Sequence, residues 1–377
     1  MDKQIQMSKV SKVKMREGFH SKLRCATKRL DRESNNSASI LKYKKVLSLP
    51  AILYIYSKVC RVESVESKRL QYVIKGEFKM KKLSIIGMPM DLGQLRRGVD
   101  MGPSAIRYAE VVERLKTLFD EIEDLGDIPV GRPEVVIDRE SKLRNLELVT
   151  EKNGKLAEEV DKVVQRGWFP LVLGGDHSIA IGTLAGVSKH YKNLGVIWYD
   201  AHGDLNTADT SPSGNIHGMP LAVSMGIGHK MLTELGGYCP KVSPENIVII
   251  GARALDEGEK DLIKEKGIKV YTMHEIDRMG MAKVMEETIA YLKNRTDGVH
   301  LSLDLDGLDP QDAPGVGTPV FGGITYRESH LAMEMLAEAN LITSAEFVEV
   351  NPILDERNKT AKVAVELMGS LFGEKLL

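Results

Sequence analysis

The stretch Val196-Ile197-Trp198-Tyr199-Asp200-Ala201-His202-Gly203-Asp204 joins an apolar, β-rich run to three side chains that can bind metal. Side chains at alternate positions of an extended strand point to one side, so Asp200, His202 and Asp204 are expected to converge. The residues between them, Ala201 and Gly203, are small. A buried strand that ends in this way predicts a metal site at the edge of a sheet.

Two further apolar runs end in polar clusters of the same kind. Leu171–Gly174 is followed by Gly175-Asp176-His177-Ser178, and Val299–Leu303 is followed by Asp304-Leu305-Asp306. A lone Asp-x-Asp is usually a solvated turn, and a lone His beside an Asp is usually structural. Three such clusters together leave little room for that interpretation, because the carboxyl ends of parallel strands meet at one edge of a sheet.

The charges of these clusters indicate more than one metal ion. Four carboxylates that face one another repel strongly unless cations neutralise them. The −4 of Asp200, Asp204, Asp304 and Asp306 is balanced by two divalent ions, with imidazoles as neutral ligands. Oxygen-rich ligand sets with some imidazole suit Mn²⁺ better than a metal that prefers thiolates.

Strand-like and helix-like segments alternate from Met80 onward. The expected strands are Leu83–Gly87, Leu171–Gly174, Val196–Tyr199, Ile247–Gly251, Val270–Thr272, Val299–Leu303 and Ser344–Val350. The expected helices are Pro103–Leu118, Glu140–Arg166, Ile179–Tyr191, Glu257–Lys266, Met281–Asn294, Tyr326–Ala339 and Thr360–Leu371. This alternation predicts an α/β fold of three layers, with a mostly parallel central sheet and helices on both faces.

Composition excludes several classes of protein. The whole chain has a net charge of −1, but the charge is unevenly distributed. Residues 1–79 have a net charge of +12, so the remaining chain has a net charge of −13. An acidic body suits neither nucleic acid nor an anionic membrane, and it attracts cationic substrates. Cys25, Cys60 and Cys239 form no framework of paired spacings, which favours a reducing cytoplasm. The longest apolar run, Val46–Val59, is too short and too interrupted to span a bilayer.

The first 79 residues differ from the rest, because they are basic, poor in Gly and without sustained strand–helix alternation. They fit a targeting presequence or a mobile basic tail. We favour a third interpretation, in which they are an artefactual upstream start. Met80 opens a typical first strand, and Lys75-Gly76-Glu77 can be encoded by a purine-rich ribosome-binding site. The domain prediction is therefore an N-terminal extension, 1–79, and a catalytic domain, 80–377.

The three clusters resemble the signatures of the ureohydrolase superfamily. The matching stretches are Gly174–Ser178, Asp200–Asp204 and Ser302–Pro310. The chain is most similar to bacterial arginases, through Met88–Gly93 and Ser211–Gly218, and the similarity runs from about Lys81 to the C-terminus. The resemblance implies the arginase fold and hydrolysis of L-arginine to L-ornithine and urea, by a hydroxide that bridges two Mn²⁺ ions in each subunit.

The resemblance also implies a ligand set for each ion. His177 and Asp204 would bind one manganese, and His202 and Asp306 would bind the other. Asp200 and Asp304 would bridge both. Asp204 would also pass a proton to the departing amine nitrogen.

By the same resemblance, further residues would bind the substrate. Asn206, Ser211, Ser213 and Asn215 would hydrogen-bond its α-carboxylate. Asp256 would take its α-ammonium, with help from Glu259. Glu349 would hold the guanidinium, and Thr318 would line the same pocket. His217 would be a proton-shuttle histidine, a duty that suits an imidazole that titrates near physiological pH.

Several alternatives stay open. Agmatinase, guanidinobutyrase and formiminoglutamase share the metal residues and differ in the pocket that reads the α-carbon. A regulatory protein on the same fold would be expected to have lost ligands, and all six are present. A histone-deacetylase-like amidohydrolase would need a mononuclear zinc site. The resemblance further implies a cytoplasmic homo-oligomer, trimeric or hexameric, whose only other partner is its small-molecule substrate.

Overall fold

The computed structural model describes residues 82–131 and 136–376. The predicted extension, residues 1–79, lies outside the described residues. Eight strands form one sheet in the order β2-β1-β3-β8-β7-β4-β5-β6. Every neighbouring pair of strands is parallel, which confirms the predicted sheet type.

The helices and strands have the following bounds. The strands are β1 Lys82–Met88, β2 Glu121–Asp127, β3 Phe169–Gly174, β4 Leu194–Tyr199, β5 Ile247–Ala252, β6 Lys269–Thr272, β7 Gly298–Asp304 and β8 Ile342–Val348. The α-helices are α4 Gly102–Tyr108, α5 Val111–Leu115, α6 Leu146–Gln165, α7 Ala180–Val187, α8 Pro220–Ser224, α9 Lys230–Thr233, α10 Glu257–Lys266, α11 Met273–Met279, α12 Met281–Lys293, α13 Tyr326–Ala339 and α14 Lys359–Leu371. Among the described residues, no helix is both long and apolar enough to pass through a membrane.

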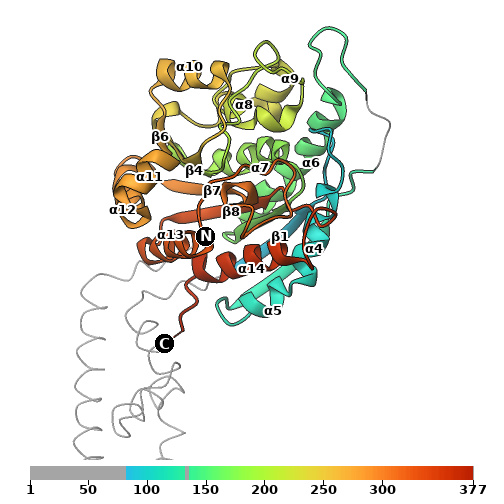
Figure 1. The fold of residues 1–377 in the computed structure, drawn as a ribbon. Helices are drawn as coiled ribbons and strands as arrows, with labels where there is room; N and C mark the ends of the chain where they lie inside the picture. The colour runs from blue at the N-terminus through green and yellow to red at the C-terminus, as the bar shows by residue number, and fades with distance from the viewer. Residues whose placement is uncertain (1–81, 132–135, 377) are drawn as a thin grey trace, which may run out of the picture. The chain divides into compact units, whose positions relative to one another are not determined.

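Both faces of the sheet are buried, as expected for a parallel sheet. On β4, Ile197 and Tyr199 belong to one apolar cluster, which includes residues of α4, α5 and α11 to α14. Val196 and Trp198 belong to the other cluster, with α6 to α9. Figure 1 shows α13 and α14 on one side of the strands and α7 on the other. The prediction of three layers is therefore confirmed.

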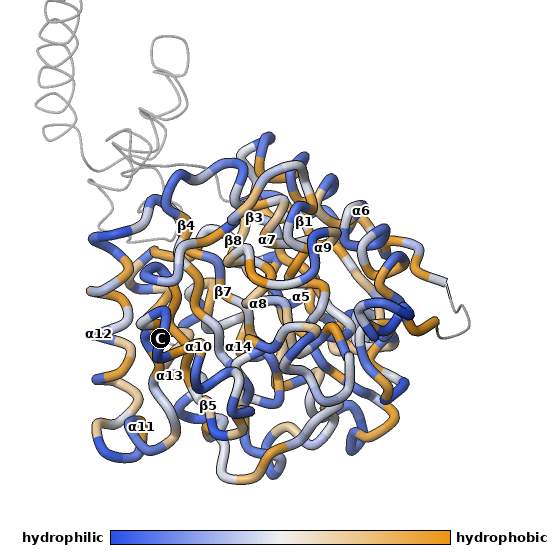
Figure 2. The backbone as a smooth tube through the Cα atoms, turned by 90° about the horizontal axis from the view of Figure 1, so that it is seen from above, coloured by the Kyte–Doolittle hydropathy of each residue, from blue (hydrophilic) through white to orange (hydrophobic). Residues whose placement is uncertain are grey.

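The covering helices are amphipathic, because each lies between the sheet and water. Figure 2 shows α12 at the edge of the domain alternating between hydrophobic and hydrophilic segments. In α12 the buried residues Val284, Met285, Thr288 and Leu292 recur at helical spacing. This spacing is the reason that the sequence pattern located the helix.

Two predicted helices differ from the structure, one in where it begins and one in being divided, and backbone conformation explains both differences. The helix expected at Glu140–Arg166 begins only at Leu146, because Asn145 takes a left-handed conformation (φ 51°). The helix expected at Pro103–Leu118 is divided into α4 and α5 by Glu110, which has φ 64°. A single residue with left-handed backbone interrupts a helix without altering its apolar pattern.

Strand β2 was not predicted, because its sequence, Glu-Ile-Glu-Asp-Leu-Gly-Asp, is polar. It lies at the edge of the sheet, where one side pairs with β1 and much of the strand remains exposed. Its acidic residues form ion pairs instead of packing in the core. Arg107 pairs with Asp124 and Asp127, and Arg166 pairs with Glu123. Charged residues on an edge strand also discourage pairing with another chain.

The strand order brings the three predicted clusters together. Strands β3, β8, β7 and β4 are the four central strands, and the clusters follow β3, β4 and β7. The first three strands form one half of the sheet, and the chain then passes over the positions of β8 and β7 to form β4, β5 and β6 in the other half. The strand order therefore changes direction between β3 and β4. Ligand sites in parallel sheets form at such a switch point, outside the carboxyl ends of the strands.

Helices α6 and α7 pack closely against each other in the helical layer on one face of the sheet. A Cβ atom added to Gly182 would lie 2.6 Å from the carbonyl oxygen of Asn153, and one added to Gly186 would lie 2.7 Å from that of Ala157. Both distances are shorter than real Cβ contacts. The two glycines therefore allow the helix backbones to approach each other.

We expect Gly186→Ala to lower the melting temperature, because overpacking of this kind costs about 1–3 kcal/mol. Gly154→Ala is the matched control: Gly154 lies in α6 with no atom within 4 Å of its added Cβ. That change should stabilise the helix by roughly 0.5–1 kcal/mol. Thermal unfolding of both variants measures the difference, and equal melting temperatures would contradict the packing argument.

Candidate metal centre

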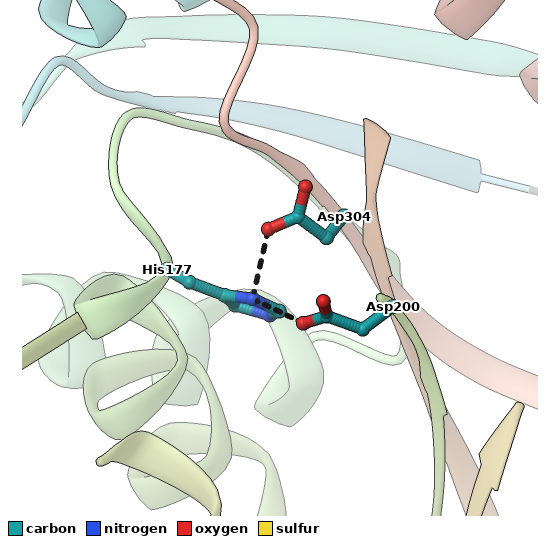
Figure 3. Close-up of side chains that lie close together, drawn as sticks. All are labelled: His177, Asp200 and Asp304. Carbon is teal, nitrogen blue, oxygen red and sulfur yellow. Dashed lines mark ion pairs between the residues drawn. The ribbon is translucent and has the colours of Figure 1, made fainter. Parts of the chain in front are cut away.

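Histidine 177 lies at the centre of a buried group of carboxylates. Its Nδ1 atom is 3.1 Å from Asp200 Oδ2, 3.0 Å from Asp204 Oδ2 and 3.2 Å from Asp304 Oδ2. Figure 3 shows His177, Asp200 and Asp304 pointing toward one another from three separate segments. The side chains of all four residues are at most 9% exposed. The sequence prediction that these groups converge is borne out for this first cluster.

A second cluster shares one member with the first. His202 Nδ1 is 3.2 Å from Asp306 Oδ2 and 3.4 Å from Asp200 Oδ1. Asp200 therefore directs one carboxylate oxygen to each histidine, which is the geometry of a bridging ligand. His177, Asp200 and Asp304 form one group with the spacing of metal ligands, and Asp200, His202 and Asp306 form another.

The three strand-end clusters are built by the same local hydrogen bond. In each, an aspartate oxygen accepts from the backbone N–H two residues later: Asp176 from Ser178, Asp200 from His202, and Asp304 from Asp306. Such turns are characteristic of Asp. They stop each strand and turn the following side chains toward the neighbouring strand ends.

The predicted reason for convergence after β4 is therefore wrong. Strand β4 ends at Tyr199, so Asp200, His202 and Asp204 do not lie on one extended strand. The turn at Asp200 and the left-handed backbone of Asp204 (φ 51°) bring the side chains of this segment to the cluster instead. A non-glycine residue held in this conformation is often found at functional sites.

The tautomer of His177 indicates that the cluster is made for a cation. The Ser302 hydroxyl donates to Glu346 Oε1 (2.7 Å), so its oxygen accepts from His177 Nε2 (2.8 Å). A neutral imidazole with its proton on Nε2 directs the Nδ1 lone pair at three carboxylate oxygens, which are acceptors as well. Nδ1 is buried and makes no geometrically correct hydrogen bond within the described residues. These residues therefore fit a metal ion.

Electrostatics in the absence of metal point the same way. Burial and the charges of Asp306 and Asp200 raise the pKa of Asp304 well above its usual value. Burial, with the charge of Asp200, raises the pKa of Asp204 to about 6. Burial opposes protonation of His177, but the adjacent carboxylates outweigh it and raise its pKa. Each shift indicates a shortage of positive charge, which a divalent ion would supply.

Trp198 supports two of these ligands. Its indole ring stacks on His177 with ring centroids 4.2 Å apart and planes 5° apart. Its Nε1–H donates to Asp200 Oδ2 at 3.0 Å. Sequence analysis gave no role to Trp198 or Ser302, although each stands two residues before an aspartate ligand. The two-residue period of a strand is a signal that could have found both.

Glu349 lies directly beside the first cluster. Its Oε1 accepts from the backbone N–H of His177 (2.9 Å) and is 3.3 Å from His217 Nδ1. Its Oε2 accepts from Gln94 Nε2 at 3.1 Å. Burial opposes protonation of His217, but the contact with Glu349 outweighs it and raises the pKa of His217. The structure thus brings together His217 and Glu349, two residues to which the sequence gave separate roles, and it adds Gln94, which the sequence did not indicate.

Thr318 is closer to the metal ligands than expected. Its hydroxyl donates to Asp306 Oδ2 at 2.8 Å, the same oxygen that faces His202. Thr318 therefore holds the carboxylate of a candidate metal ligand.

Asn206, predicted to bind an α-carboxylate, forms a second network with Asp256 and Glu259, which were predicted to bind an α-ammonium. Asn206 Nδ2 donates to Asp256 Oδ2 at 2.9 Å. Glu259 lies behind them and is buried, with one oxygen accepting from Leu205 N–H and the other from Asp256 N–H. Both oxygens of Glu259 are thus occupied by the backbone. This geometry gives Glu259 a supporting role, joining the loop after Asp204 to the start of α10.

The segment 211–215 carries the other hydroxyl and amide groups that were predicted to bind the α-carboxylate. Ser211 Oγ accepts from Gly214 N–H, and Ser213 Oγ accepts from Asn215 N–H. A hydroxyl that accepts in this way keeps its proton for another acceptor, such as a carboxylate. Asn215 Oδ1 is buried and has no partner among the described residues.

Comparison with known proteins gives one consistent result. Residues 81–373 match the sequence family described as the arginase family. A curated arginase of Bacillus caldovelox is 77% identical over 299 residues, which are 79% of this chain and 100% of that protein. The arginase of Bacillus subtilis (strain 168) is 72% identical over 297 residues, covering 79% of this chain and 99% of its own. The solved native structure of the Bacillus caldovelox arginase at pH 5.6 has a TM-score of 0.77 and 76% identity, and the match covers 79% of this chain and 100% of that one.

We expect Ser302→Ala to weaken metal binding about 10–100-fold, because the group that fixes the His177 tautomer is removed. Ser344→Ala is the matched control. Ser344 is equally buried on β8, but it contacts His300 and no metal-ligand residue. Calorimetric titration of both variants with Mn²⁺ measures their metal affinity. An equal loss of affinity in the two would count against a role for the tautomer.

Proposed function

The chain belongs to the arginase family of hydrolases, and we propose that it hydrolyses L-arginine to L-ornithine and urea. The observation that supports this most is the position of Glu349, whose Oε1 accepts from the backbone of the candidate metal ligand His177. A carboxylate fixed at this point can pair with a guanidinium cation and hold its carbon beside the metal site. Relatives named arginase, at up to 77% identity, support the same substrate.

We propose two Mn²⁺ ions as the cofactor. His177 and Asp204 would hold one ion and His202 and Asp306 the other, with Asp200 between them. Asp304 would be the second residue shared by both ions: it directs Oδ2 to the first site, and its Oδ1 accepts from Asp306 N–H as Asp200 Oδ1 accepts from His202 N–H. When bound, such a pair of ions acidifies a water molecule and supplies the nucleophile that a guanidinium needs.

The protein side chains do the remaining work. Glu349 pairs with the guanidinium and orients it, since a carboxylate can accept two parallel N–H bonds. The Asn206–Asp256 pair and the 211–215 segment hold the α-ammonium and α-carboxylate, and so fix the other end of the substrate. Asp204, whose Oδ2 lies 3.0 Å from His177 Nδ1, would take the proton of the attacking nucleophile and pass it to the departing amine nitrogen. The residues assigned to the α-carboxylate distinguish an amino-acid substrate from agmatine, which has no α-carboxylate.

His217 relays protons between the site and solvent. One ring nitrogen contacts Glu349, yet the side chain is 18% exposed, so it reaches both the buried pocket and water. Because its pKa is raised above the ordinary value, the imidazole gives up its proton at a higher pH than a free histidine.

We further propose that the protein acts in the cytoplasm as a homo-oligomer, trimeric or hexameric. The acidic composition after residue 79 supports a small cationic substrate and neither a nucleic acid nor a membrane as partner.

The substrate assignment predicts that the Mn²⁺-loaded protein releases urea from L-arginine much faster than from agmatine. Removal of metal with a chelator should abolish urea release, and added Mn²⁺ should restore it. A urea assay with metal analysis of the same sample checks both points. Faster release from agmatine would overturn the substrate, and no more than one ion per chain would overturn the paired cofactor.

His217→Asn should lower kcat by about 10²-fold or more, the usual scale for losing a general acid–base group, with metal content unchanged. The wild-type kcat should rise with pH as His217 loses its proton, above the ordinary histidine range, and the variant should lack this rise. A pH profile of kcat for both proteins makes the comparison. A variant profile that matches the wild-type shape would exclude the relay.

A further inference from the structure

Gln94 lies in the loop after β1 and reaches the site from a part of the chain with no predicted role. The residue is 5% exposed, and its Nε2 donates to Glu349 Oε2 at 3.1 Å across 255 positions of sequence. An ionised carboxylate only accepts hydrogen bonds, so the amide atom that faces it must be the nitrogen. This requirement fixes the orientation of the amide group, so Oε1 is the terminal atom that does not face Glu349 Oε2.

The loop that carries Gln94 is held by three other site loops. Gly93 N–H donates to Asp176 Oδ2 at 2.8 Å, and Gly93 O accepts from His217 N–H at 3.1 Å. Arg96 Nη1 donates to Gly317 O at 2.6 Å. The position of the Gln94 side chain is therefore set by the same loops that carry His177, His217 and Thr318.

Gly317 lies against the Gln94–Glu349 pair. A Cβ atom added there would be 2.7 Å from Glu349 Oε2 and 3.1 Å from Gln94 Oε1. The carboxylate oxygen and the amide oxygen thus lie side by side under a residue with no side chain. Nε2 of Gln94 is engaged by Glu349, so Oε1 is the atom of the amide that can accept from a ligand.

We propose that Gln94 is a specificity-determining residue, whose Oε1 accepts an N–H of the substrate guanidinium while Nε2 holds Glu349 in place. The inference rests on the proposed function, which puts the guanidinium at Glu349. A guanidinium carries five N–H donors and no acceptor. Glu349 supplies two acceptors and Gln94 a third beside them, and the amide adds no charge to a region that already holds many carboxylates.

The test separates the two ends of the substrate, because L-ornithine shares the amino-acid end of arginine but lacks the guanidinium. Gln94→Met removes the donor and the acceptor while keeping the length of the side chain. In the Mn²⁺-loaded protein, KM for arginine should rise about tenfold, as expected for loss of a hydrogen bond to a charged group. The Kd for ornithine, measured by calorimetry, and the metal content should stay at wild-type values.

The matched control is Gln311→Met, the same change at an exposed position outside the site, which should alter none of these quantities. Gln94→Leu is the second variant, in case the methionine variant does not fold. An unchanged KM for arginine, or an equal loss of arginine and ornithine binding, would overturn the role of Gln94 while leaving the proposed function intact. A wild-type protein that binds ornithine but releases no urea from arginine would instead overturn the proposed function.

Discussion

The mutual repulsion of four buried carboxylates is the constraint on which the rest of the site depends. Asp200, Asp204, Asp304 and Asp306 crowd around two imidazoles at one edge of the sheet, and burial together with the charges of Asp306 and Asp200 raises the pKa of Asp304. Cations and partial protonation relieve this repulsion, and rigid elements keep the side chains close enough to bind the ions. Four parallel central strands, buried on both faces, provide that rigidity.

Neighbouring residues direct this unfavourable charge toward cation binding. The Ser302 hydroxyl and the Trp198 ring fix the orientation of His177, and Trp198 also donates to Asp200. His177 Nδ1 is buried and has no hydrogen-bond partner among the described residues, so its lone pair is left toward the cluster. The cost of an unsatisfied buried atom is offset when an ion binds, so stability and metal binding are linked in this region.

The pocket next to the metal centre is assembled from loops that hold one another. Glu349 accepts from the backbone of His177 and from Gln94, so the carboxylate proposed to bind the guanidinium and a candidate metal ligand share one hydrogen-bond network. Glu259 likewise joins the loop after Asp204 to Asp256. Positioning of the substrate and positioning of the ions therefore cannot vary independently, which explains how loops, normally the mobile part of a fold, keep a fixed geometry here.

The sequence alone determined the layered α/β class and the six residues of the two candidate metal clusters, because ligand-type residues at the ends of apolar runs mark both the strands and their carboxyl edge. It could not determine the edge strand β2, whose polar residues pair with Arg107 and Arg166 from distant segments. Nor could it find Gln94, since no local pattern reports that residues 94 and 349 meet. Local periodicity depends on neighbours in the chain, whereas these contacts depend on the strand order, and only the tertiary structure sets that order.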